Sequence, residues 1–310
     1  MLQEIKALPK VELHAHLNGC LRKETLIEFL AEEGRNEEFE KELTMDEAFR
    51  LFSVVHSVVT RPDRVERITR EMLEDFEKEN TVYIEIRTSP KATQFMTKLE
   101  YINAIIKAIR EFQGKMVTKV LISVNRAQSV EAAWENIELA KNFPECVGVE
   151  FSGNPNIAKF KDFLEVFNHA REIGMKVSIH TAEIPDLEDT LEIIRFRPDR
   201  LGHCCYLETE AENLIIENRI PIEICPSSNM ATMGLTSMID HHFGRFYERS
   251  HPIAICTDDT LLLNTTLSKE YYLVAETFHL TVDDLKRIVR ESALMSFFDW
   301  HTIYFAQNPL

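Results

Sequence analysis

Basic residues are scarce in this chain. Its 35 Lys and Arg residues stand against 51 Asp and Glu residues, which gives a formal net charge of −16. Nucleic acids and anionic membranes attract proteins through an excess of Lys and Arg, so we expect neither partner. No apolar run approaches the ~20 residues of a membrane-spanning helix. The N-terminal sequence MLQEIKALPK lacks the apolar core of a signal peptide. These absences predict a soluble protein.

Cysteine and glycine are also scarce. The six cysteines show no paired spacing, which in a chain of 310 residues predicts reduced thiols and a cytoplasmic protein. Only 9 glycines are present, and no Ser/Gly linker or low-complexity tract divides the chain. The hydrophobic content of 45% is sufficient for a large core. We therefore expect residues 1–310 to form a single domain.

Short β-branched and apolar runs alternate with amphipathic stretches. The predicted strands are residues 11–16, 81–86, 119–124, 147–151, 176–180, 200–203, 221–225 and 253–256. Helical patterns cover 98–112, 130–142, 157–173, 186–195 and 208–218. Strand followed by helix, repeated eight times, is typical of a closed (β/α)8 barrel, which needs ~250 residues.

The residues in excess of a minimal barrel also show helical patterns. They lie between the first two strands, at 26–33, 45–58 and 64–79, and near the C-terminus, at 267–278 and 282–297. A doubly wound open sheet is the alternative fold. No glycine-rich dinucleotide turn follows an early strand, which favours the barrel.

Polar residues gather where the predicted strands end. Barrel enzymes build their active sites at the carboxyl ends of different strands, so this pattern predicts an enzyme. The residues are His14 and His16, Glu85 and Arg87, Asn125, Ser152 and Gly153, His180, His203, and Asp258 and Asp259.

His14 and His16 are two residues apart, so on a strand their imidazoles face the same side. Burying both without a metal or other partners would be costly. His180 and Asp258 are the candidates for further ligands. Three imidazoles and a carboxylate suit zinc, although iron, manganese and cobalt use similar ligands.

Glu183 follows His180 by three residues, just beyond the strand end. A carboxylic acid there can reach over a metal without binding it and can act as a general acid. The alternative is an ordinary acidic residue at the start of a helix.

Several motifs in this order resemble the adenosine deaminase family of the amidohydrolase superfamily. They are LPKVELHAHLNG, IEIRTSP, SIHTAE, RLGHC and ICTDD, and the resemblance extends from residue 8 to about 298. The stretches HLNG, HHFG and LSKEYYLVAETF are similar to the branch of the family formed by N6-methyl-AMP deaminases.

This resemblance implies a (β/α)8 barrel with one Zn²⁺ held by His14, His16, His180 and Asp258. It implies that Glu183 protonates N1 of a purine. It also implies that water oriented by His203 and Asp258 attacks carbon 6 and that an amine leaves.

The resemblance further implies the substrate and its contacts. We expect a monomer that deaminates a purine nucleotide, N6-methyl-AMP, to IMP and methylamine. Asparagine at position 18 replaces the aspartate of adenosine deaminases proper and would not repel a 5′-phosphate. An adenosine deaminase and a non-catalytic metal-binding signalling protein remain the alternatives. The implied contacts are His16, Asn18, His56, Thr88, Ser89, Pro90, Lys91, Asn125, Gly153 and Asp259.

The chain departs from the family pattern at three places. Cys204 stands where members usually have glycine, and Asn125 stands where the branch commonly has aspartate. Residues 260–263 replace a glycine-containing loop. None of these positions is an implied metal ligand or the implied acid, so we expect catalysis to be kept and the pocket wall to differ.

Overall fold

A computed structural model describes residues 1–37 and 45–308. Eight parallel strands form one sheet in the order β1 to β8, and neighbouring strands in the sequence are neighbours in space. This arrangement confirms the predicted (β/α)8 barrel. The strands are β1 (Lys10–His16), β2 (Thr81–Thr88), β3 (Val117–Asn125), β4 (Cys146–Ser152), β5 (Lys176–Thr181), β6 (Arg200–His203), β7 (Ile222–Ile224) and β8 (Ile253–Ile255).

The first and last strands meet at the carboxyl end of the barrel. The Asp258 amide donates to the His14 carbonyl at 2.8 Å, and the His16 amide donates to the Asp258 carbonyl at 3.0 Å. Deeper in the seam, the Glu12 carboxylate accepts the amides of His14 (2.8 Å) and Thr257 (3.0 Å). A side chain thus replaces part of the strand ladder between β1 and the segment that follows β8.

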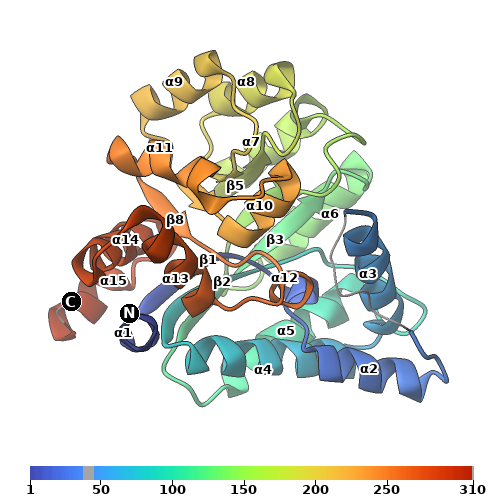
Figure 1. The fold of residues 1–310 in the computed structure, drawn as a ribbon. Helices are drawn as coiled ribbons and strands as arrows, with labels where there is room; N and C mark the ends of the chain where they lie inside the picture. Colours follow the sequence, from blue (N-terminus) through green and yellow to red (C-terminus); the bar gives the residue numbers. More distant parts are fainter. Residues whose placement is uncertain (38–44, 309–310) are drawn as a thin grey trace.

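The helices surround the sheet, and the N-terminal helix α1 lies beside α13, in the C-terminal part of the chain (Figure 1). Helices between β1 and β2 contain many of the residues that exceed a minimal barrel, as the sequence predicts. The helices are α1 (Leu2–Ala7), α2 (Lys23–Glu32), α3 (Met45–Val58), α4 (Pro62–Lys78), α5 (Lys98–Glu111), α6 (Val130–Ala140), α7 (Leu164–Glu172), α8 (Leu187–Phe196), α9 (Thr209–Asn218), α10 (Pro226–Met233), α11 (Phe243–Glu248), α12 (Thr260–Leu263), α13 (Leu267–Phe278), α14 (Val282–Met295) and α15 (His301–Gln307). The 3₁₀ turns are η1 (Leu17–Gly19), η2 (Phe160–Phe163) and η3 (Met238–Asp240).

Helix α4 shows how the local sequence sets a helix. Proline stands at its first position, where the amide hydrogen that proline lacks would have no partner within the helix. Apolar residues recur at helical spacing on one face. The buried apolar residues of this face are Val65, Ile68, Met72, Leu73 and Phe76.

The helix predicted at residues 157–173 begins later than expected. The Asp162 carboxylate accepts the Lys159 amide at 3.1 Å, and this cap starts a 3₁₀ turn rather than an α-helix. The short helices α1, α10, α11, α12 and α15 were not predicted, because four to eight residues are too few to show a helical period.

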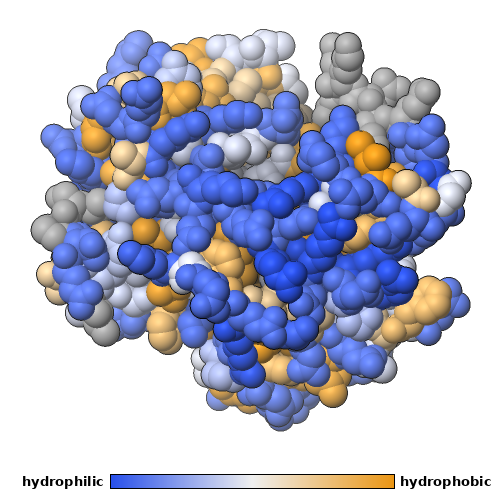
Figure 2. All heavy atoms as spheres, turned by 90° about the horizontal axis from the view of Figure 1, so that it is seen from below, coloured by the Kyte–Doolittle hydropathy of each residue, from blue (hydrophilic) through white to orange (hydrophobic). Residues whose placement is uncertain are grey.

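Within the part of the chain that the structure describes, no helix has both the length and the apolarity needed to cross a membrane. The face in Figure 2 is mostly hydrophilic, with hydrophobic residues in small groups. All six cysteines are buried and unbridged.

Candidate metal centre and active site

Four side chains from different strands meet at the carboxyl end of the barrel. His14 and His16 lie on β1, His180 lies on β5, and Asp258 follows β8. The Nε2 atom of His180 lies 3.2 Å from Nε2 of His14 and 3.2 Å from Nε2 of His16. Asp258 Oδ1 lies 3.4 Å from each of these two β1 nitrogens. We call these four residues the histidine cluster.

The donor atoms of the histidine cluster fit a metal ion. His14 Nδ1 faces the Glu223 carboxylate at 2.8 Å, so this nitrogen donates and Nε2 presents a lone pair to the cluster. Four ligands at 2.0–2.1 Å from one tetrahedral centre lie about 3.3–3.4 Å apart. The observed separations of 3.2–3.4 Å are close to this value. His180 Nδ1 lies 3.5 Å from Glu150 Oε2, so a carboxylate also faces the outer nitrogen of this ring.

The charges around His14 also attract a cation. Burial and the Arg87 charge would lower the pKa of the His14 imidazole, but Asp258 and Glu223 outweigh them and raise it to about 9. Burial lowers the pKa of His180 well below its ordinary value. The carboxylates therefore draw positive charge to this point, and a metal ion supplies that charge while leaving the imidazoles neutral.

A second group of possible ligands overlaps the histidine cluster. The ligand atoms of His14, His203, Cys225 and Asp258 also lie within 4.8 Å of one another. The two groups share His14 and Asp258, so a metal ion bound by one group prevents binding of a second ion by the other. Burial raises the pKa of the Cys225 thiol well above its ordinary value, which disfavours the thiolate that a metal needs.

Glu183 and His203 face each other beside the histidine cluster. Glu183 Oε1 lies 3.9 Å from His203 Nε2, and burial together with the Asp258 charge raises the pKa of Glu183 to about 7. Asn229 Nδ2 lies 2.9 Å from His203 Nδ1. If this amide donates, His203 Nδ1 is the acceptor and Nε2 carries the hydrogen. His242 Nε2 donates to the His203 carbonyl at 2.7 Å.

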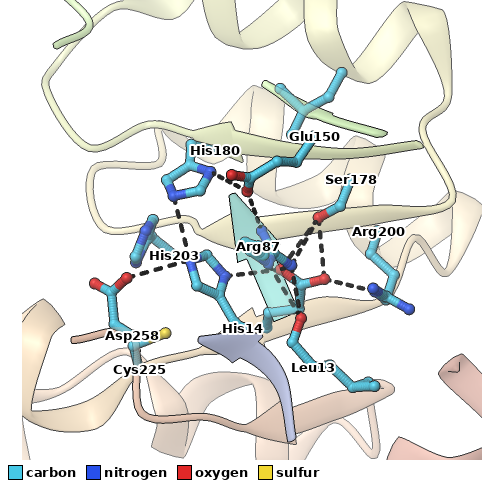
Figure 3. Close-up of polar contacts among 12 residues, drawn as sticks. Leu13, His14, Arg87, Glu150, Ser178, His180, Arg200, His203, Cys225 and Asp258 are labelled. Carbon is cyan, nitrogen blue, oxygen red and sulfur yellow. Dashed lines mark hydrogen bonds and ion pairs between the residues drawn. The ribbon is translucent and has the colours of Figure 1, made fainter. Parts of the chain in front are cut away.

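A buried ionic network lies beneath the histidine cluster (Figure 3). Arg87 contacts Glu150 (2.7 Å) and Glu223, and Arg200 contacts Glu223 (2.5 Å) and Glu85. Burial would raise the pKa of Glu223, but the two guanidinium groups lower it below its ordinary value. Glu85 and Arg87 are fully buried in this network. Their charges are thus paired inside the barrel, where Arg87 holds the Glu223 carboxylate that contacts His14.

Asp258 and Asp259 are held from different sides. Ser228 Oγ on α10 donates to Asp258 Oδ2 at 2.7 Å. The Asp259 side chain lies against η1, where a Cβ on Gly19 would come within 1.6 Å of Asp259 Oδ1. Glycine at position 19 is therefore required for this close approach. Burial and the neighbouring Asp258 raise the pKa of Asp259 well above its ordinary value.

The structure links two of the predicted substrate residues through a residue that the sequence did not single out. Asn18 Nδ2 lies 3.4 Å from the Tyr101 hydroxyl, which lies 2.7 Å from Thr88 Oγ1. All three residues are buried.

The remaining predicted substrate residues form separate contacts. Lys91 Nζ lies 3.3 Å from His56 Nδ1 and donates to the His56 carbonyl at 3.2 Å. Burial lowers the pKa of Lys91 to about 8. A Cβ on Gly153 would come within 2.6 Å of Asn125 Oδ1, so these two residues touch. Ser89 Oγ donates to the Ser123 carbonyl at 3.4 Å, and Pro90 beside it is buried.

Two departures from the family pattern have a structural context. Cys204 has φ = 58°, a left-handed conformation that favours glycine, and its side chain is fully buried. Leu261 and Leu262 line a cavity of about 590 Å³ between α4 and the segment after β8. None of the residues lining this cavity belongs to the histidine cluster.

Comparisons with known proteins show the family of this chain and its similarity to solved structures. The family model described as adenosine deaminase matches residues 9–302. A protein from Arabidopsis thaliana named N6-mAMP deaminase is 32% identical, covering 93% of this chain and 92% of its own. The adenosine deaminase-like protein of Drosophila melanogaster is 35% identical, covering 96% and 94%. The crystal structure of Arabidopsis ADAL complexed with IMP has a TM-score of 0.91 at 32% identity, covering 98% of this chain and 96% of its own.

Proposed function

This chain belongs to the adenosine deaminase family, and we propose that it deaminates N6-methyl-AMP by hydrolysis to IMP and methylamine. The observation that carries this proposal is the histidine cluster beside a partly buried carboxylic acid, Glu183. The relative named N6-mAMP deaminase and the ADAL structure with IMP favour a nucleotide as the substrate.

The proposed cofactor is one Zn²⁺ per chain, held by His14, His16, His180 and Asp258. Three nitrogens and one oxygen at the observed separations suit zinc. When bound, zinc lowers the pKa of a coordinated water toward ~7 and so supplies a nucleophile at neutral pH.

Three residues handle the protons in the proposed reaction. Glu183 gives a proton to N1 of the purine ring, which makes carbon 6 electrophilic, and its raised pKa supports this role. His203 orients the attacking water by donating from Nε2, because Asn229 fills its other nitrogen. Asp258 accepts a hydrogen bond from the same water. The water oxygen bonds to carbon 6, and one water proton passes through Asp258 to the amine nitrogen. The bond from carbon 6 to that nitrogen breaks, the hydroxyl proton on carbon 6 goes to Glu183, and methylamine leaves while N1 keeps its proton.

The remaining contacts orient the nucleotide. We assign the purine edge to Asp259 and the Gly153 backbone, with Asn125 against that glycine. Lys91 supplies a cation for the 5′-phosphate in an otherwise acidic chain, and its contact with His56 supports a joint role. The full proposed set is His16, Asn18, His56, Thr88, Ser89, Pro90, Lys91, Asn125, Gly153 and Asp259.

We further propose that residues 1–310 act as one domain and as a cytoplasmic monomer. The continuous hydrophobic core and the shared sheet support one domain. Six buried thiols without a disulfide support a reducing compartment.

The test is turnover of N6-methyl-AMP, AMP, N6-methyladenosine and adenosine side by side by zinc-loaded protein. We expect N6-methyl-AMP to have the highest kcat/KM. Turnover of adenosine alone would make the protein an adenosine deaminase. No turnover of any of the four by protein that retains its metal would favour a non-catalytic metal-binding role.

A further inference from the structure

Tyr101 connects two segments of the proposed nucleotide site from outside the barrel. It lies in the first turn of α5, and its side chain is fully buried. A capping box fixes the start of this helix, because Thr97 Oγ1 accepts the Glu100 amide at 3.2 Å and Glu100 accepts the Thr97 amide at 2.8 Å. The Tyr101 hydroxyl is therefore held in place between η1 and the end of β2.

The hydroxyl joins a chain of three polar groups. On one side lies Thr88 Oγ1 at 2.7 Å, and on the other lies the Asn18 amide at 3.4 Å. With Nδ2 of Asn18 turned toward Tyr101, Oδ1 of Asn18 is buried without a hydrogen-bond partner among residues 1–37 and 45–308. A buried acceptor without a partner is costly, which points to a ligand or to the opposite orientation of the amide.

The direction of the hydrogen bonds decides what Asn18 offers to the substrate. A tyrosine hydroxyl carries one hydrogen and can also accept. If Thr88 donates to Tyr101, the Tyr101 hydrogen is free to bond Asn18 Oδ1. The amide then presents Nδ2, a donor, to the site. A donor suits the oxygens of a phosphate, which can only accept when ionised.

We propose that Tyr101 is a positioning residue that turns the Asn18 amide so that Nδ2 faces the 5′-phosphate of the nucleotide. The chain runs from Thr88 through Tyr101 to Asn18 Oδ1, and each group in it is then satisfied. This inference rests on the proposed nucleotide substrate. Tyr101 orients the uncharged Asn18 side chain so that it can bind the 5′-phosphate. A nucleoside, which lacks the phosphate, gains little from this orientation.

The test measures binding of IMP and inosine by calorimetry in Tyr101→Phe, in Asn18→Ala and in the double variant. The control is Tyr271→Phe on α13, which removes the hydroxyl of another fully buried tyrosine. We expect Tyr101→Phe to raise the Kd for IMP about tenfold and the Kd for inosine less than about twofold. In the Asn18→Ala background, Tyr101→Phe should change the Kd for IMP less than about twofold.

Two results would overturn the inference. One is the same weakening of IMP binding with and without the Asn18 amide, because Tyr101 would then act through packing. The other is equal weakening for IMP and inosine. Turnover of N6-methyl-AMP by the wild type is measured separately. Its absence refutes the proposed function, whereas an unchanged Kd for IMP in Tyr101→Phe refutes only the role of Tyr101.

Discussion

Replacing Glu183 by glutamine removes a transferable proton from the site and keeps the size and hydrogen-bonding capacity of the side chain. The carboxyl group lies beside His203, and only 24% of its side chain is exposed. Burial raises its pKa from 4.5 to about 7. The structure thus increases the proton-bearing fraction of the Glu183 carboxyl group at neutral pH.

The size of the expected effect follows from this pKa. At pH 7 a carboxyl group with a pKa of 7 is about half protonated, whereas one with a pKa of 4.5 is protonated in only ~0.3% of molecules. The environment therefore raises the proton-bearing fraction ~150-fold. Loss of a positioned general acid typically costs ~10²–10⁴-fold in rate. We expect Glu183→Gln to lower kcat/KM for N6-methyl-AMP by at least about 10².

The assay compares kcat/KM from pH 5 to 9 for the wild type, Glu183→Gln and Glu188→Gln, whose carboxylate is 79% exposed. Because the protonated form is the active one, wild-type activity falls as the pH rises through about 7. The Glu183→Gln variant should lose this alkaline limb and keep its metal, and Glu188→Gln should resemble the wild type. A loss under about threefold in Glu183→Gln would refute its role as the acid.

Three further predictions concern the metal and the phosphate. Purified protein should contain about one equivalent of transition metal by elemental analysis, and His14→Ala or Asp258→Ala should lose most of it; full retention in both would refute the ligand set. Glu223→Gln should weaken zinc affinity ~10–100-fold in a chelator competition, because it weakens the hydrogen bond at His14 Nδ1, whereas Ser178→Ala should not. Asn18→Asp places a negative charge beside the phosphate. The repulsion between two unit charges is roughly 3 kcal/mol at ~5 Å and an effective dielectric of ~20. The kcat/KM ratio of N6-methyl-AMP to N6-methyladenosine should therefore fall at least about tenfold, and an unchanged ratio would separate Asn18 from the phosphate.

Periodic patterns predicted the fold well. Strand β6 and helix α13 have the bounds that their residue patterns indicated, Arg200–His203 and Leu267–Phe278. The side chain of Thr266 caps α13 by accepting the Lys269 amide, which fixes the start of the helix in the local sequence. The short helix α12 carries no such signal. Helix α10 has Pro226 at its start and Gly234 just after its end, but its eight residues are too few to show a helical period.

The candidate site was predictable where alternation along one strand places residues together, as for His14 and His16. The partners that hold these residues come from distant strands and helices, and no local pattern encodes those pairings. Glu223 did carry a signal, because a charged residue inside an apolar strand must find a buried partner. Tyr101 resembles any core residue of an amphipathic helix. Its hydroxyl reaches Asn18 only when α5 packs beside η1 in the folded protein.

The seam between β1 and the segment after β8 joins residues that lie 245 positions apart, Glu12 and Thr257. At a synthesis rate of ~5–20 residues per second, Asp258 is made about 12–50 s after His14 and His16. Until then, one side of β1 is an unpaired edge of a growing sheet, and its imidazoles lack the Asp258 carboxylate. A nascent or truncated chain that stops before residue 258 contains all three histidines and still lacks the centre. Arrival of the final strand completes the barrel and the site in the same step.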